Sequence, residues 1–305
     1  MADITVIGGI NIDIEGRPFA PLLYRDSNPG RIVLSYGGVG RNIAENIART
    51  GGHVAMISVI GEDPIGEGAR RELEALGVDI SGIEKIPGVS TAMYLSILND
   101  RRDMELALCD MEILSYLTAE KILSHSAQLR QSKVVALDGN LEEPLLERIT
   151  ESLDGIRLFF DPVSASKAVK GKKHIGRFFA VKPNRLEAET LTGIRIRDEK
   201  DLRRAADCFL EQGVRQVYIT LSQEGVFYKD RQQEGILRPV RGEVVSATGA
   251  GDSFSAMILQ GIAENFDIER TARMGMAAAS ITMESQSAVN QKICREEIIR
   301  RMQDV

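Results

Sequence analysis

The stretch KVVALDGNLEEPLLERITESLDGIRLFFDP, residues 133–162, carries the pattern that predicts the fold. Two short apolar runs, 133–140 and 156–162, each end in polar or acidic residues, and a helical pattern over 142–152 separates them. A strand, a helix and a second strand in this order favour two parallel strands joined by a right-handed crossover. The polar ends of both runs would then lie at the same edge of one sheet.

The same alternation continues through most of the 305 residues. It predicts an α/β protein with a doubly wound, mostly parallel sheet between helices, built as a single domain over 1–305. Ligands bind such sheets outside the carboxyl ends of the strands. The residues predicted at that edge are Asn11, Asp13, Asn140, Asp161, Lys182 to Glu187 and Thr220. The further strands are predicted at 4–9, 54–61, 178–184 and 216–222, and the further helices at 40–52, 65–77, 118–129, 185–192, 198–212, 250–264, 268–283 and 294–303.

Two segments interrupt the alternation, approximately 14–36 and 90–108. Both read as strands with no helix between them, and NDRRD (99–103) reads as a hairpin turn. They predict a small antiparallel sheet beside the main one. Its role is open between a pair of edge hairpins and a lid that closes the site and excludes water.

The composition excludes several classes of protein. A net charge of −6 gives no basic surface for polymeric nucleic acid. The three cysteines are far apart and favour a reducing compartment, and three scattered histidines argue against a histidine metal cluster. The N-terminus does not read as a signal peptide, and no apolar run is long enough to span a membrane. We therefore expect a cytoplasmic protein with a small-molecule substrate.

The segment VVSATGAGDSFSAMILQG (244–261) places glycines before a helix that is predicted to begin near Ala250. It lacks the Lys-Ser/Thr pair of a Walker A loop. Unpaired N–H groups at such a helix start can hold an anion, and Asp252 would lie beside them in the first turn. From this segment alone, a helix cap and a catalytic base that takes a proton from an attacking hydroxyl stand about even.

Three other segments carry polar groups suited to a ligand. YGGVGRNIAENIA (36–48) combines glycines with Asn42 at a helix start, although this segment alone favours a glycine turn with an Asn cap. GGINIDIEG (8–16) reads as a strand that ends in Asn11 and Asp13, whose side chains suit vicinal hydroxyls. KPNRLEAETLTG (182–193) sets Asn184 and Glu187 three apart, where they could bind Mg²⁺ through water.

In this order and spacing, GGVGRN (37–42), KPNRLEAE (182–189) and TGAGDSF (248–254) resemble the ribokinase-like (PfkB) family of sugar and nucleoside kinases. The resemblance covers nearly the whole chain. It implies ATP and Mg²⁺, with Asp252 as general base and the backbone of Gly249, Ala250 and Gly251 as the anion hole. It implies a lid that often also makes a dimer contact, so a homodimer is expected. The remaining implied roles are sugar binding by Asn11, Asp13, Gly38 and Asn42, Mg²⁺ and phosphate binding by Asn184 and Glu187, and ATP binding by Thr220 and Gly225.

Further segments, DSNPGRI (26–32) and DPVSASKAVK (161–170), resemble members of the family that act on a nucleoside. Ser27, Asn140 and Lys167 are the candidates for contacts with the base. Each also has a plainer reading, as a turn, a helix cap and a solvated lysine. A ribose, adenosine or fructose kinase, and a non-catalytic relative, remain the alternatives.

The chain departs from the family pattern at two positions. Members activated by a monovalent cation usually carry an acid where this chain has Ser246, although Thr248 is kept, which leaves a K⁺ site in question. Ser222 replaces a glycine near the expected phosphates.

Overall fold

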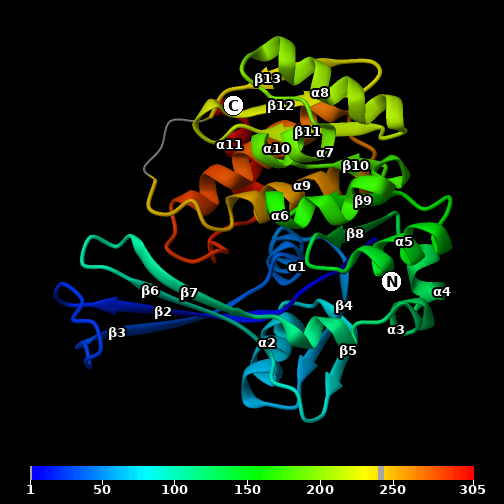
Figure 1. Cartoon of the computed structure of the whole chain (residues 1–305). Coiled ribbons are helices and arrows are strands. Elements are labelled where there is room, and N and C mark those ends of the chain that lie inside the picture. Colours follow the sequence, from blue (N-terminus) through cyan, green and yellow to red (C-terminus); the bar gives the residue numbers. More distant parts are fainter. Residues whose placement is uncertain (1, 240–243) are drawn as a thin grey trace.

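The computed structural model describes residues 2–239 and 244–305, and the main sheet runs through the middle of the molecule (Figure 1). Most of its neighbouring strands are parallel, and the last two strands in chain order add an antiparallel edge. The predicted α/β class with a mostly parallel sheet is confirmed. In order across the sheet the strands are β13 (Glu234–Leu237), β12 (Val226–Lys229), β11 (Gln216–Thr220), β10 (Ala180–Val181), β9 (Leu158–Asp161), β8 (Val134–Asp138), β1 (Ile4–Ile7), β4 (Val54–Gly61) and β5 (Asp79–Ile86).

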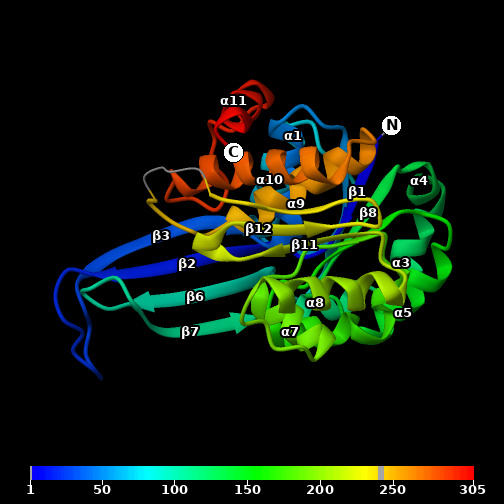
Figure 2. The same ribbon diagram turned by 90° about the horizontal axis from the view of Figure 1, so that it is seen from above.

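Helices cover both faces of this sheet, as Figure 2 shows from above. The strands are buried on both sides, so successive residues such as Val134 and Val135 pack into different cores. One face packs on α1 (Val39–Arg49), α2 (Pro64–Ala75), α9 (Ala250–Ala263), α10 (Ile268–Met283) and α11 (Arg295–Arg301). The other packs on α3 (Ala119–Ser124), α4 (Ser126–Gln131), α5 (Glu143–Ser152), α6 (Ala165–Ala168), α7 (Arg185–Thr192) and α8 (Glu199–Gln212), with 3-10 turns at Glu112–Tyr116 and Val169–Arg177.

A second, small sheet projects from the main body (Figures 1 and 2). Its order is β3 (Gly30–Gly37), β2 (Asn11–Pro18), β6 (Ala92–Leu98) and β7 (Met104–Asp110). The β2–β3 and β6–β7 pairs are antiparallel, and a parallel β2–β6 pair joins them. The predicted hairpin turn forms, because the amide of Asn99 donates to the carbonyl of Asp103 at 2.8 Å. The small sheet predicted from 14–36 and 90–108 is therefore present.

Several boundaries differ from the sequence prediction. The strand predicted over 4–9 ends at Ile7, and Asn11 and Asp13 open β2 of the small sheet instead of ending a strand. The helix predicted over 118–129 is divided at His125 into α3 and α4. The pattern also missed β5, β12 and β13. The burial pattern of β5 does not alternate, which removes the period-2 signal that marks a half-buried strand.

Candidate active site

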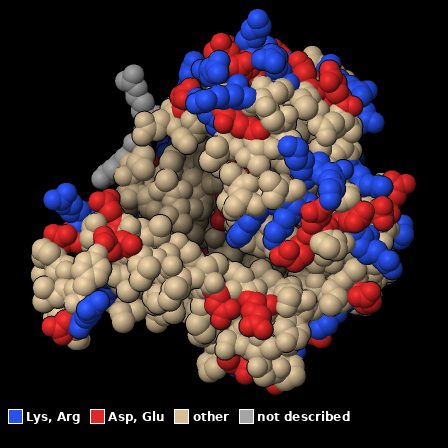
Figure 3. Space-filling model, viewed as in Figure 1, with Lys and Arg blue, Asp and Glu red and all other residues tan. Residues whose placement is uncertain are grey.

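The carboxyl ends of the parallel strands form the edge from which the small sheet leaves, since β2 follows β1 directly. Asp138 ends β8, Asp161 ends β9 and Thr220 ends β11, so the predicted edge exists. Figure 3 shows that the surface is hollowed between the small sheet and the main body. The sequence motifs converge on this region.

Helix α9 begins at this edge without a side-chain cap. Its N-cap residue, Gly249, has a left-handed backbone with φ of 80°, and an added Cβ would collide with the carbonyl oxygen of Ala288. Within residues 2–239 and 244–305, no hydrogen-bond acceptor meets the amides of Gly251 and Asp252. Free N–H groups at a helix start are suited to an anion or to developing negative charge.

Asp252 lies in the first turn of α9 and is half-buried. Its carboxylate Oδ2 accepts a hydrogen bond from Nδ2 of Asn42 on α1 at 2.8 Å, which brings two of the motifs together. The pKa of Asp252 is raised to about 7. Burial is the largest cause and the Asp161 carboxylate adds to it, while the Asn42 hydrogen bond and the Lys182 charge lower the pKa. A carboxyl that titrates near neutral pH is well matched to general-base catalysis.

Behind Asp252 lies a buried charged network whose role the sequence motifs do not predict. The ammonium of Lys182 lies 3.0 Å from Oδ2 of Asp161 and donates to the carbonyl of Gly251 at 3.3 Å. The same Asp161 oxygen accepts from the hydroxyl of Ser255 at 2.7 Å. Burial alone would lower the pKa of Lys182, but the carboxylates of Asp161, Glu187 and Asp252 together raise it, so the ammonium stays charged. The only sequence signal was the position of these residues at strand ends.

Asn184 and Glu187 form a capping box at the start of α7. The amide of Glu187 donates to Oδ1 of Asn184 at 2.9 Å, and both Glu187 oxygens accept from Asn184, at 2.8 Å from the backbone and 2.7 Å from the side chain. Burial raises the pKa of Glu187, and the backbone hydrogen bond of Asn184 opposes this. Thr220 pairs with Asn184 in an isolated β-bridge, and Gly225 lies at the β11–β12 connection that follows.

The predicted sugar ligands lie where the two sheets meet. Nδ2 of Asn11 donates to Oδ1 of Asp13 at 2.7 Å, and burial raises the pKa of Asp13. Gly38 is the N-cap of α1 with φ of 101°, and a Cβ there would lie against the carbonyl oxygen of Gly9. Only glycine allows this close approach between the start of α1 and the segment that leads into β2.

The structure brings two of the three candidates for base contacts together and places the third apart from them. Asn140 follows β8, and its Oδ1 accepts a hydrogen bond from the ammonium of Lys167 on α6, so these two residues are brought together. Ser27 is exposed on the connection between β2 and β3, which Figures 1 and 2 place at the far end of the small sheet. Within the described residues, the polar partner of Ser27 is the neighbouring Asp26.

The candidate cation residues lie just before α9. Thr248 is exposed, and its amide donates to Oγ of Ser246 at 3.2 Å. Ser222, the other departure from the motif pattern, has φ of 53° in a short 3-10 turn after β11. Within residues 2–239 and 244–305, no group of three or more His, Cys, Asp or Glu side chains is arranged to hold a metal. No helix in the described part of the chain is both long enough and apolar enough to cross a membrane.

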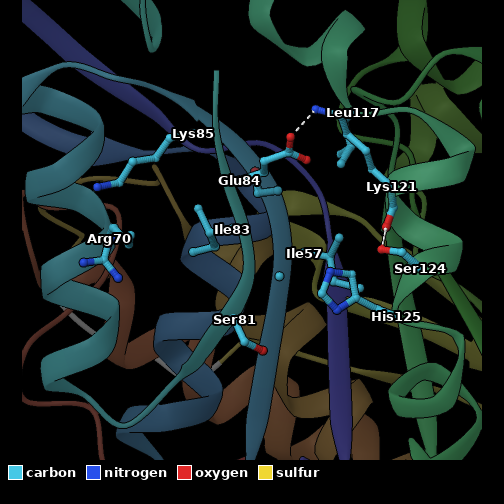
Figure 4. A pocket seen from close by; sticks show the side chains of 12 residues that line it. Ile57, Arg70, Ser81, Ile83, Glu84, Lys85, Leu117, Lys121, Ser124 and His125 are labelled. Carbon is cyan, nitrogen blue, oxygen red and sulfur yellow. Dashed lines mark hydrogen bonds and ion pairs between the residues drawn. The ribbon is translucent and has the colours of Figure 1, made fainter. Parts of the chain in front are cut away.

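A second hollow, of about 530 Å³, lies beside the edge strand β5 (Figure 4). Its cations are neutralised locally, because Lys121 contacts Glu84 at 2.6 Å, and Arg70 and Lys85 both contact Glu67. None of the predicted site residues lines it. The candidate catalytic residues therefore lie at the carboxyl edge and not in this hollow.

Comparison with known proteins agrees with the position of these motifs. The model of the pfkB family of carbohydrate kinases matches residues 1–293. Pseudouridine kinase of Escherichia coli is 33% identical over 297 residues, covering 97% of this chain and 95% of the relative. The sugar kinase YeiI of the same organism, described as uncharacterized, is 35% identical over 286 residues, covering 93% and 79%. A crystal structure of a putative sugar kinase from Clostridium perfringens superimposes with a TM-score of 0.89 at 31% identity, covering 99% of this chain and 96% of that one.

Proposed function

We propose that this chain, which belongs to the pfkB family of carbohydrate kinases, transfers a phosphoryl group from ATP to the 5′-hydroxyl of pseudouridine. Membership of the family makes the chain an ATP-using phosphotransferase. The observation that carries the proposal is the start of α9, where the half-buried Asp252 lies beside amides that have no acceptor among the described residues. This pairs a base for an alcohol with a place for the charge that develops on the phosphoryl group.

In the proposed reaction, Asp252 accepts the proton of the attacking hydroxyl late in the transfer. The backbone of Gly249, Ala250 and Gly251 holds the oxygens of the transferred group, with the Ala250 amide exchanging its 3.4 Å contact to the Ala247 carbonyl for a phosphate oxygen, and Gly249 gives that loop a shape that a side chain would disrupt. Lys182 holds the Gly251 carbonyl from behind and keeps Asp161 from facing Asp252 as an unpaired charge. Electrostatic stabilisation of this kind is usually the largest contribution to such a reaction.

The residues at the start of α7 fit Mg²⁺ bound with the phosphates. Glu187 is buried with both oxygens held by Asn184, and each carboxylate oxygen keeps a further lone pair for a metal-bound water. Mg²⁺ usually keeps several waters and is held by one or two carboxylates together with substrate phosphates. We propose that Asn184 and Glu187 hold it in this way, that Thr220 and Gly225 line the ATP site, and that Mg²⁺ neutralises phosphate charge.

Recognition of the nucleoside is assigned to the junction of the two sheets. Asn11, Asp13, Gly38 and Asn42 would hold the ribose hydroxyls. The pseudouracil ring carries both N–H donors and carbonyl acceptors, and the adjacent Asn140 and Lys167 together offer an amide and an ammonium. Ser27 could reach the base only through a movement of the small sheet. The similarity to pseudouridine kinase of Escherichia coli supports this choice of substrate.

The small sheet is proposed as a lid that also forms a homodimer contact. Strand register puts Ile14, Leu34, Leu95 and Leu108 on one face, and Leu34 and Leu108 are each 62% exposed. An apolar face of this kind on a projecting sheet favours a second copy as its cover. The prediction is a dimer in sedimentation analysis that Leu108→Glu converts to monomer.

A different sugar or nucleoside kinase is the alternative, since YeiI, named as a sugar kinase, is as similar as pseudouridine kinase. The test incubates the chain with ATP, Mg²⁺ and, separately, ribose, uridine, pseudouridine, adenosine and fructose, and scores products by mass. Turnover of ribose or adenosine well above that of pseudouridine would reject the substrate and keep the kinase. No product from any acceptor would favour a non-catalytic nucleoside-binding relative.

A further inference from the structure

Arg41 is a buried cation next to the candidate active site. It is 4% exposed, lies on α1 beside Asn42, and pairs with Glu45 at 2.6 Å and Glu72 at 3.0 Å through Nη2. Its other terminal nitrogen, Nη1, donates to Oδ1 of Asn42 at 3.2 Å and to the Tyr36 carbonyl at 3.1 Å. No role in catalysis follows from the motifs for Arg41, yet it touches a residue that touches Asp252.

The chemistry of these groups decides how the Asn42 amide is oriented. A side-chain amide has one accepting end and one donating end, and an arginine can only donate. The end of Asn42 that faces Arg41 must therefore be the oxygen. The donating Nδ2 is left to face Asp252, where it lies 2.8 Å from Oδ2.

We propose that Arg41 is a positioning residue that holds the Asn42 amide so that its N–H, and never its oxygen, faces Asp252. The consequence is that Asn42 stabilises the ionised carboxylate, the form that can accept a proton. Without Arg41 the amide is free to turn over and present its oxygen, which would accept a hydrogen bond from protonated Asp252. Since Nη1 also binds the Tyr36 carbonyl, the end of β3 is part of the same arrangement.

This inference rests on the proposed role of Asp252 as the base, but its test does not need turnover. Asp252 is flanked by Asp161 of β9, Asp138 of β8 and Lys182 after β10, and those charges are unchanged when Arg41 is replaced. The direct measurement is the carboxyl ¹³C titration of Asp252 in the full chain labelled at aspartate. The resonance is assigned by its loss in Asp252→Asn.

The expected result in Arg41→Met is a titration midpoint about one pH unit higher than in the wild type, because the hydrogen bond that favours the charged form is lost. The same replacement in an Asn42→Ala background should move the midpoint by less than about 0.3 units, since the amide that transmits the effect is gone. A comparable shift in both backgrounds would overturn the proposal and leave a through-space charge effect. No shift in either background would also overturn it.

Arg49→Met is the matched control, because Arg49 lies on the same helix and binds the same Glu45, at 2.7 Å, without touching Asn42. It should leave the midpoint unchanged, and an equal shift would mean that Glu45 is the relevant group. Arg41→Met/Glu45→Met removes both buried members of the pair and serves if the single variant folds poorly. It should show the same upward shift.

The pH dependence of turnover gives a second readout with whichever acceptor is active. Below the midpoint the rate should fall tenfold per pH unit, so Arg41→Met should lose about tenfold in kcat at pH 6 and less than about twofold at pH 9. A shifted ¹³C titration without turnover of any tested acceptor by the wild type would reject the proposed function and keep the role of Arg41. Turnover with an unshifted titration would do the reverse.

Discussion

Helices α7 and α9 both begin at the carboxyl edge of the main sheet, and their first turns differ in every polar contact. At α7, Asn184 and Glu187 satisfy each other's backbone amides through a complete capping box. At α9, the cap is a left-handed glycine without a side-chain hydrogen bond, and the acid of the first turn contacts Asn42 of another helix. The carboxylates of both helix starts, Glu187 and Asp252, raise the pKa of Lys182.

The difference separates two ways of handling phosphate. At α7 the capping box occupies the amides of Asn184 and Glu187, so we expect this helix start to act chiefly through the side-chain oxygens of these two residues and whatever those oxygens order around them. An uncapped start keeps its amides for a ligand, so α9 can act through its backbone. We therefore expect changes at α7 to raise the Mg²⁺ concentration that activity needs, and changes at α9 to lower kcat.

The largest effect is expected for Asp252→Asn, which keeps the shape of the side chain and removes the base. Loss of a general base typically costs about 10²–10⁴ in rate, so kcat should fall by that amount with little change in the Kd for the acceptor. Steady-state kinetics and calorimetric titration measure the two quantities. A kcat within tenfold of the wild type would show that Asp252 is not the base.

The matched control for Asp252→Asn is Asp267→Asn on α10. Asp267 is a true cap, accepting from the amide of Arg270 at 2.8 Å, and lies away from the carboxyl edge. Asparagine caps a helix about as well as aspartate, so this replacement should cost no more than a few tenths of a kcal/mol of stability and leave kcat unchanged. If both variants lowered only stability, the first turn of α9 would be a structural feature like that of α10.

The second effect is expected for Gly249→Ala, which tests the backbone of α9. The new Cβ would require a shift away from the Ala288 carbonyl and would stand in a left-handed conformation. Displacing one donor of an anion hole costs about 10² in kcat. Gly193→Ala, at the end of α7, has a similar φ of 74° with nothing within 4 Å of the added Cβ, so it carries the strain alone. Equal loss of activity in both would reject the anion hole.

Much of this comparison could be predicted from the sequence. The spacing of Asn184 and Glu187 is a local capping signal, and the glycines before Ala250 mark a helix start, so both helices were placed to within a residue. The partner of Asp252 could not be predicted, because Asn42 lies 210 residues away. The same holds for Lys182 and Asp161, which meet only after β9 and β10 pair. Local chemistry is visible in a sequence, whereas partners brought together by the sheet are not.

A smaller effect is expected for Glu187→Gln at α7. A glutamine can accept only one of the two Asn184 hydrogen bonds and brings an amide toward the other donor. The Mg²⁺ concentration for half-maximal activity should rise about tenfold, as is typical for loss of a group that orders a metal. Glu189→Gln is the control, because Glu189 lies on the same helix and its side chain accepts a hydrogen bond from the amide of Ile196, beyond the helix end, at 2.7 Å. An equal rise in both variants would assign the effect to helix stability.

The smallest effect is expected from exchanging K⁺ for Na⁺. Ser246 stands where cation-activated relatives carry an acid, and its Oγ already accepts from the amide of Thr248. Without a negative charge, carbonyl and hydroxyl oxygens attract a monovalent ion weakly, so kcat should change by less than about twofold. Ser246→Asp should create a dependence on K⁺ that the wild type lacks, whereas Ser81→Asp, exposed on the edge strand β5, should not. A wild-type chain strongly activated by K⁺ would mean that oxygens near Thr248 suffice, and the uncapped start of α9 would then depend on an ion as α7 does.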